Sequence, residues 1–115
     1  MAEYFRYALW AVAVTLVVGC AAMGPSARGR DIHAGRVLAE HYCAQCHAIG
    51  SFGASPMSEA PAFRTLSERY PIETLAPRFA AGISASHPAM PHWTFDPGEN
   101  EAIISYLDSI QAKHN

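Results

Sequence analysis

A short cysteine-histidine motif constrains this chain more than any other feature. Two thiols stand three positions apart in Cys43-Ala-Gln-Cys46, and His47 follows at once. This spacing lets both thiols form thioether bonds to the two vinyl groups of a haem, while the adjacent imidazole reaches the iron. The motif therefore predicts one covalently attached haem with His47 as an axial ligand.

Three other chemistries use the same residue types. A redox dithiol normally belongs to a strand-helix-strand pattern, which the surrounding sequence lacks, and it leaves the adjacent histidine unexplained. A zinc site needs a second ligand pair, and the third cysteine, Cys20, is remote. A structural disulfide across three positions rarely gives a relaxed bridge. These are the alternatives to haem at this stage.

The size of the chain favours a cofactor in its core. The chain has 115 residues, of which 50% are hydrophobic and 16% are charged. Much of the apolar content lies in one N-terminal block, so the part that folds is smaller still. A domain of that size commonly needs a metal, a disulfide or a haem to complete its core. A net charge of −2 without a basic run argues against a nucleic-acid binder.

The N-terminal block indicates export. Residues 7–23 carry no charge and follow Arg6. A length of about 17 residues is at the lower limit for spanning a bilayer, and the apolar centre suits a signal peptide. The tetrapeptide Val17-Val18-Gly19-Cys20 resembles a bacterial lipobox, in which a peptidase cuts before the cysteine and the new N-terminal cysteine carries the lipid. Cleavage after Ala22, an uncleaved anchor and a buried core helix are the alternatives.

These features divide the chain into three segments. Residues 1–19 are expected to be a signal peptide or membrane anchor, residues 20–30 a linker, and residues 31–115 the folded domain. We expect the domain on the periplasmic side of a membrane, held there by a lipid on Cys20 or by the N-terminal segment. A soluble periplasmic protein is the alternative.

Helical periodicity begins where the linker ends. Asp31 is expected to cap a helix that leads into the haem motif. The inward stripe of this helix has three- and four-residue spacing and consists of Ile32, Gly35, Leu38, Ala39 and Tyr42. Gly35 costs about 1 kcal/mol relative to alanine unless close packing offsets it. Another helix is therefore expected to cross the first one at Gly35.

Two helices are expected in the middle of the chain. Thr65 and Glu68 have the spacing of a capping box, which predicts a short helix through Tyr70. Apolar residues over 72–83 predict a second helix that ends at Gly82. Pro77 removes a backbone donor, so the start of this second helix is expected to be delayed to about Glu73 or Thr74.

The last helix has the clearest start signal. Asp96 is expected to be its N-cap, with Pro97 in the first turn and Glu99 completing the cap. Its apolar stripe consists of Ile103, Tyr106, Leu107 and Ile110. Ile103 and Tyr106 are expected to fill the space left at Gly35, and Asp108 and Gln111 are expected to face solvent.

A second axial ligand is sought downstream of His47. The candidate side chains are Met57, His87, Met90, His92 and His114. Met57 follows His47 too soon in the chain, and His114 is the penultimate residue. Prolines at 88 and 91 stiffen the backbone around Met90 and present its thioether on a short strap. Met90 is therefore favoured over His87 and His92, while core packing is the ordinary role of a methionine.

In the order and spacing of these features, residues 31–112 resemble the class I c-type cytochromes, which are small monohaem bacterial electron carriers. The resemblance rests on Gly35, the Cys43–His47 motif, Pro61, the strap around Met90 and the terminal helix with Tyr106 and Leu107. It implies an all-α, cytochrome c-like fold with three to five helices around one haem.

The resemblance also implies roles for individual residues. His47 and Met90 are the expected axial ligands, and the carbonyl of Pro61 is expected to accept a hydrogen bond from His47 Nδ1, with Pro56 as the weaker match. Trp93 and Phe95 are expected to close the apolar side of the haem pocket.

The expected function is one-electron transfer between respiratory or dehydrogenase partners, without enzymatic turnover. A thioether ligand favours ferrous iron, and two filled axial positions leave no site for a small substrate. The expected partners are a protein donor and a protein acceptor. One alternative is a haem subunit fixed inside an oxidoreductase complex. Another is a gas sensor or peroxidase with a labile sixth ligand.

Overall fold

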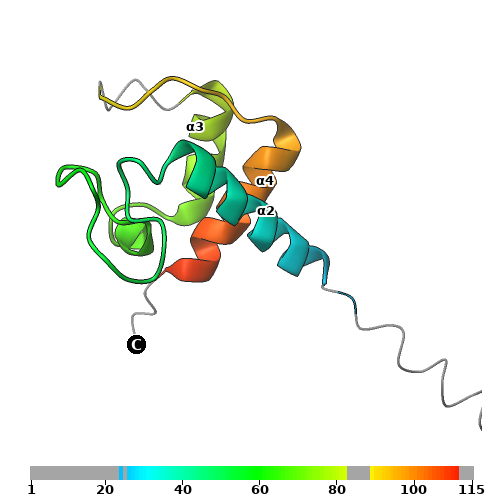
Figure 1. Ribbon diagram of the computed structural model, residues 1–115. Helices are drawn as coiled ribbons and strands as arrows, with labels where there is room; N and C mark the ends of the chain where they lie inside the picture. Colours follow the sequence, from blue (N-terminus) through cyan, green and yellow to red (C-terminus); the bar gives the residue numbers. More distant parts are fainter. Residues whose placement is uncertain (1–23, 25, 83–88, 112–115) are drawn as a thin grey trace, which may run out of the picture.

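The computed structural model describes residues 24, 26–82 and 89–111, and its regular structure is helical, with no strand in these ranges. The predicted all-α class is therefore confirmed for this part of the chain. The elements in chain order are α2 (Ala27–Tyr42), the 3₁₀ helices η1 (Phe63–Glu68) and η2 (Ile72–Leu75), α3 (Ala76–Ala81) and α4 (Pro97–Ile110). Helices α2 and α4 cross at the centre, and the loop from α2 to η1 extends to one side (Figure 1).

Several predictions made from the sequence fall outside the described residues. These are the signal or anchor over 1–19, the lipid on Cys20, and the alternative ligands His87 and His114.

Helix α2 begins earlier than the sequence predicted. Its N-cap is Ser26, whose side chain accepts a hydrogen bond from the Gly29 amide at 3.1 Å. Asp31 is therefore not the cap, and residues 27–30 are helical instead of part of a linker. The extra turn carries Arg28, which makes an ion pair with Asp108 of α4 at 2.9 Å. This tertiary contact gives the first turn a partner that the local sequence does not reveal.

The crossing at Gly35 is confirmed. A methyl group built on Gly35 would lie 2.6 Å from the carbonyl carbon of Ala102 and 2.7 Å from Tyr106 Cβ, so only glycine fits there. Tyr106 was the predicted neighbour, but the backbone of Ala102, and not the side chain of Ile103, is the nearest group. Ile103 and Leu107 of α4 are nevertheless fully buried beside the crossing.

The helix at 63–68 starts before its predicted cap. Ala62 occupies the N-cap position without a side-chain hydrogen bond, and η1 begins at Phe63. Thr65 already lies inside the first turn, where its hydroxyl donates to the Ala62 carbonyl at 2.9 Å. The predicted capping box between Thr65 and Glu68 is therefore wrong, because its threonine bonds back to the residue that caps the helix.

Pro77 splits the next helical stretch into two elements. The residues before it form η2, and the α-helix α3 starts at Ala76 with Pro77 in its first turn, where a missing amide donor costs nothing. The predicted start at about Glu73 or Thr74 is therefore wrong, because the 3₁₀ helix starts at Ile72 and the α-helix only at Ala76. Helix α3 ends at Gly82, whose φ of 93° favours glycine, as predicted.

Helix α4 begins as predicted but ends differently. The Asp96 side chain accepts from the Glu99 amide at 2.9 Å, and Glu99 accepts from the Asp96 amide at 3.0 Å. At the other end, Gln111 does not merely face solvent. Its side-chain oxygen accepts from Ser67 N at 2.9 Å, and its nitrogen donates to the Phe63 carbonyl at 2.8 Å. Gln111 therefore ties the end of α4 to η1.

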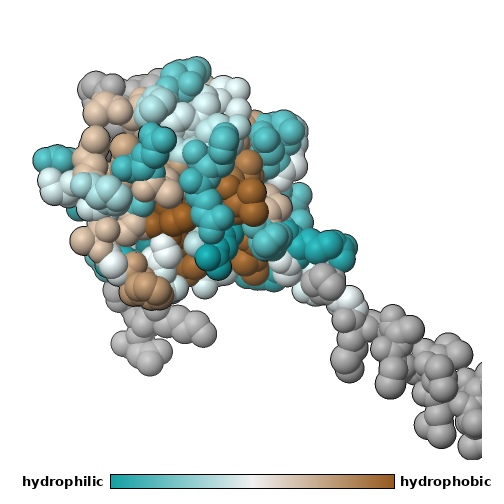
Figure 2. Space-filling model, in the orientation of Figure 1, coloured by the Kyte–Doolittle hydropathy of each residue, from teal (hydrophilic) through white to brown (hydrophobic). Residues whose placement is uncertain are grey.

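The core lies where these elements meet. Its buried members are Ala39, Cys43, Phe63, Ile72, Leu75, Phe79, Phe95, Ile103, Tyr106 and Leu107. The opposite faces of α2 and α4 are largely polar. In the space-filling view, apolar surface shows in the middle of one face, bordered by hydrophilic side chains (Figure 2).

Candidate functional site

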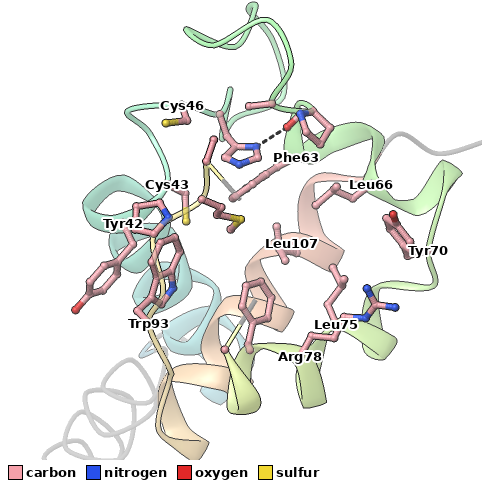
Figure 3. A pocket seen from close by; sticks show the side chains of 18 of the residues that line it. Tyr42, Cys43, Cys46, Phe63, Leu66, Tyr70, Leu75, Arg78, Trp93 and Leu107 are labelled. Carbon is pink, nitrogen blue, oxygen red and sulfur yellow. Dashed lines mark hydrogen bonds between the residues drawn. The ribbon is translucent and has the colours of Figure 1, made fainter. Parts of the chain in front are cut away.

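A large apolar pocket opens beside the helix crossing. Its volume is about 650 Å³, within the range of about 300–1,000 Å³ that is usual for small-molecule sites. Its walls come from the end of α2, the loop that follows, η1, the η2–α3 segment and the strap around Met90. Figure 3 shows the lining side chains from close by.

Both motif cysteines face this pocket. Backbone bonds to the Cys43 carbonyl from Cys46 N at 3.1 Å and from His47 N at 2.9 Å wind the motif into a compact turn at the end of α2. Cys43 is 4% exposed and Cys46 is partly exposed, and both thiols are free. The turn therefore presents two thiols and one imidazole to the same cavity (Figure 3).

The environment of Cys43 does not suit a redox dithiol. Burial raises the pKa of the Cys43 thiol to about 12, and the neighbouring Cys46 adds to this rise. A dithiol that exchanges with other proteins needs an accessible thiol with a lowered pKa. Among the residues that the structure describes, no three His, Cys, Asp or Glu side chains form a cluster that could hold a zinc ion.

His47 is oriented by the predicted carbonyl. Its Nδ1 lies 2.7 Å from the Pro61 carbonyl oxygen, and since a carbonyl can only accept, Nδ1 carries the proton (dashed line in Figure 3). The other ring nitrogen, Nε2, is then left with a free electron pair for a metal. The Phe63 ring packs against the imidazole, with centroids 5.0 Å apart.

Of the candidate second ligands that the structure describes, two methionines line the pocket and one histidine does not. Met90 and Met57 are both part of the lining, whereas His92 is exposed and packs against Gly82. The Met57 amide donates to the Cys46 carbonyl at 3.1 Å, so Met57 belongs to the same loop that holds His47 and Pro61. Met90 reaches the pocket from a separate segment, 43 positions after His47 in the chain.

Aromatic side chains close one side of the pocket. Tyr42 stacks on Trp93 with centroids 5.9 Å apart, and Phe95 contacts Tyr42 at 5.6 Å and Phe79 at 5.5 Å. Trp93 lines the pocket as expected, whereas Phe95 is buried in the core and is not among the lining residues, so its predicted place in the pocket wall is wrong. The Trp93 Nε1 is buried and has no hydrogen-bond acceptor among the described residues.

These residues fit a covalently bound haem. The pocket offers two free thiols, an imidazole with its iron-binding nitrogen available, thioethers, and walls that are mainly apolar. A flat apolar group would also cover lining residues that the chain itself leaves open, such as Met57, which is 38% exposed.

Among the lining residues that sequence reasoning missed are three with polar groups. Arg69, Tyr70 and Arg78 also line the pocket, although they lie outside the haem motif and the strap. Their only signal in the sequence is a pair of arginines in two short apolar helices. A further missed contact is the Tyr106 hydroxyl, which donates to the Ile49 carbonyl at 2.9 Å and so ties α4 to the loop behind His47. Burial raises the pKa of Tyr106.

Comparisons with other proteins do not identify the chain. No protein-family model, curated protein or solved structure matches it. Among the described residues, no helix is both long enough and apolar enough to cross a membrane.

Proposed function

We propose that this chain is an electron-transfer protein with a cytochrome c-like fold and one covalently bound haem. A single observation carries the proposal: Cys43, Cys46, His47 and Met90 come from two distant segments and line one apolar pocket. When bound, the haem supplies an iron that gains and loses one electron between its ferric and ferrous forms.

The chain's own residues would hold this group from three directions. Cys43 and Cys46 provide the two thioether bonds, with the haem vinyl groups as their partners. His47 binds the iron through Nε2, and the Pro61 carbonyl fixes the plane of the imidazole and strengthens it as a ligand. Met90 supplies a neutral, soft sulfur from the strap.

The chemistry of this ligand set favours electron transfer over turnover. A thioether stabilises ferrous iron, and the apolar lining disfavours the additional positive charge of ferric iron, so the reduction potential is raised. His47 and Met90 would both bind the iron, and this would leave no position open for a small substrate. Phe63 and Leu66 add to the apolar lining, and the bound group would exchange electrons with protein partners.

Export belongs to the same proposal. Covalent attachment of haem takes place on the far side of the bacterial membrane, which agrees with the apolar N-terminal block. We propose a periplasmic location with Cys20 as the site of a lipid anchor. Mass spectrometry of the mature N-terminus would distinguish lipidated Cys20 from cleavage after Ala22 and from an uncleaved segment.

A matched pair of methionine variants tests the ligand assignment. In the haem-loaded protein, Met90→Ala is expected to remove the low-spin His/Met absorption spectrum and to lower the reduction potential. Met57→Ala is the control, because Met57 lines the same pocket but lies on the His47 loop, and it should change neither property. A spectrum that survives Met90→Ala and is lost in Met57→Ala would overturn the assignment.

Carbon monoxide distinguishes the proposed carrier from a sensor or peroxidase. The reduced wild-type protein is expected not to bind this gas at neutral pH, since Met90 holds the sixth position. Met90→Ala should bind it. Rapid binding by the wild-type protein would favour the sensor or peroxidase.

A further inference from the structure

The pocket has a cationic side that the ligand set does not use. Arg69 and Arg78 both line it, and the guanidinium carbon of Arg78 lies 5.6 Å from the centre of the Tyr70 ring. Arg69 directly precedes Tyr70 in the chain, and both residues line the pocket. In Figure 3, Tyr70 and Arg78 lie on the side of the pocket opposite Cys43 and Cys46.

The charge on this side is not balanced within the lining. Neither Arg69 nor Arg78 takes part in the ion pairs of α2, Arg28–Asp108 and Arg36–Glu40. Glu59 is the one acidic residue that the described lining contains. The remainder is mainly apolar, so two guanidinium groups beside it favour a ligand with an apolar body and an anionic edge.

A haem has this distribution of groups. Its two vinyl groups lie towards one edge of the ring, and its two propionate carboxylates lie towards the opposite edge. Thioether bonds at Cys43 and Cys46 leave the propionates pointing to the opposite side of the pocket. That side carries Tyr70 and Arg78, and Arg69, also a lining residue, directly precedes Tyr70 in the chain.

We propose that Arg69 and Arg78 bind the two haem propionates and so fix the orientation of the cofactor within the pocket. This inference rests on the proposed function. Tyr70 supports it by restricting the Arg78 side chain through the contact of the guanidinium with its ring. Two cations paired with two carboxylates also bring the edge of the cofactor close to electroneutrality.

The two arginines would then set the pKa of the propionate carboxyl groups. An opposite charge nearby lowers the pKa of a carboxyl group by about 1–3 units, whereas burial raises it. The other titratable side chains facing the pocket are Tyr42, His47, Glu59 and Tyr70, together with the thiols that the haem would occupy. Of these, the exposed Glu59 has a lowered pKa, through its own backbone and Ser58, and it ionises in every variant below.

The test measures the reduction potential of the haem-loaded protein from pH 5 to pH 9. The variants are Arg78→Gln, Arg78→Lys and Arg69→Gln/Arg78→Gln. Arg28→Gln is the control, since it removes the same charge from a site outside this pocket. Arg78→Gln should move the pH at which the potential begins to fall upward by about 1 unit or more. Arg78→Lys should restore most of the wild-type profile, and the double variant should show the largest shift.

A second measurement remains informative when a variant binds little haem. The resonance Raman bending modes of the propionates, recorded on wild type, Arg78→Gln and Arg78→Lys, report directly on their hydrogen bonds. Changed modes in Arg78→Gln, with Arg28→Gln unchanged, would support the proposal. Identical pH profiles and identical propionate modes in wild type and both Arg78 variants would overturn it. In that case, intact thioether attachment and an unchanged His/Met spectrum would leave the proposed function standing.

Discussion

At the crossing of α2 and α4 the chain fills its own interior, whereas the adjoining side of the molecule surrounds a pocket of about 650 Å³. Around Gly35 the two backbones are so close that a single methyl group does not fit, and Ile103 is fully buried. Around His47 the loops leave large side chains in the open, including Phe52, which is 88% exposed. Leu107 belongs to both regions, because it is fully buried and also lines the pocket.

The difference shows how so small a domain can be stable. One region obtains its packing from side chains that the sequence itself provides, and its contacts are complete without any ligand. The other region has apolar walls that face each other across a space, and these walls stabilise the fold only when something apolar lies between them. We propose a covalently bound haem as this occupant, because two thiols and one imidazole line the same space.

The largest expected effect comes from removing the cofactor's attachment. In Cys43→Ser/Cys46→Ser, the pocket walls lose their common partner, and we expect a loss of at least about 5 kcal/mol, the lower end of a domain's total stability. Hydrogen exchange should accelerate most in the pocket loops, for example at the Phe63 amide that bonds to the Ala48 carbonyl. Equal acceleration at the α2–α4 crossing and in the pocket loops would contradict the contrast between the two regions.

A substitution at the α2–α4 crossing tests the region that packs without a ligand. Gly35→Val places a branched side chain against the Ala102 carbonyl and Tyr106, and it should destabilise the protein by about 3 kcal/mol, since neither backbone can move without disturbing the core. Gly50→Ala is the matched control, because a methyl group there has nothing within 4 Å and should change stability by less than about 0.5 kcal/mol. Denaturant unfolding measures both, and a Gly35→Val protein as stable as wild type would rule out the close crossing.

Removing the Gln111 side chain, which joins α4 to η1, should have an intermediate effect on stability. Gln111→Ala removes the bonds to Ser67 N and the Phe63 carbonyl, and partly buried groups left without partners cost about 1–3 kcal/mol. Gln45 is exposed on the motif turn, so Gln45→Ala is the control and should be nearly neutral. If thermal unfolding of the two variants were the same, Gln111 would not join α4 to η1 in solution.

The smallest effect is expected at the edge of the crossing. The ion pair between Arg28 and Asp108 joins side chains that are 71% and 58% exposed. Such surface pairs contribute at most about 1 kcal/mol and are screened by salt. Arg28→Ala should therefore lower the unfolding midpoint slightly at low salt and not at high salt, and a loss as large as that of Gly35→Val would be inconsistent with this account.

Local signals predicted the features that depend on neighbouring residues. The Asp96–Glu99 capping box and the end of α3 at Gly82 both follow from short-range backbone chemistry. The crossing at Gly35 followed from a longer pattern, because a glycine within an apolar stripe is useful only where another backbone comes close. The His47–Pro61 contact was anticipated from the resemblance to c-type cytochromes, and the structure contains that hydrogen bond.

The features that the sequence did not reveal depend on contacts between distant residues. Ser26 and Asp31 are both good caps, and the choice of Ser26 brings Arg28 of α2 to Asp108 of α4. Gln111 has the helical position of a solvent-facing residue, yet its partners lie more than 40 positions earlier in the chain, at separations of 44 and 48. Arg69 directly follows η1 and Arg78 belongs to α3, and only the folded chain brings both into the lining of one pocket.

The central claim is that Cys43 and Cys46 bind one haem covalently. It is tested most directly by mass spectrometry of the proteolytic peptide containing residues 43–47, after expression with a bacterial haem-attachment system. The account predicts that this peptide carries the mass of one haem and that neither cysteine reacts with a thiol reagent. Two free thiols, or a disulfide between them, in protein that has been exported and folded would contradict it.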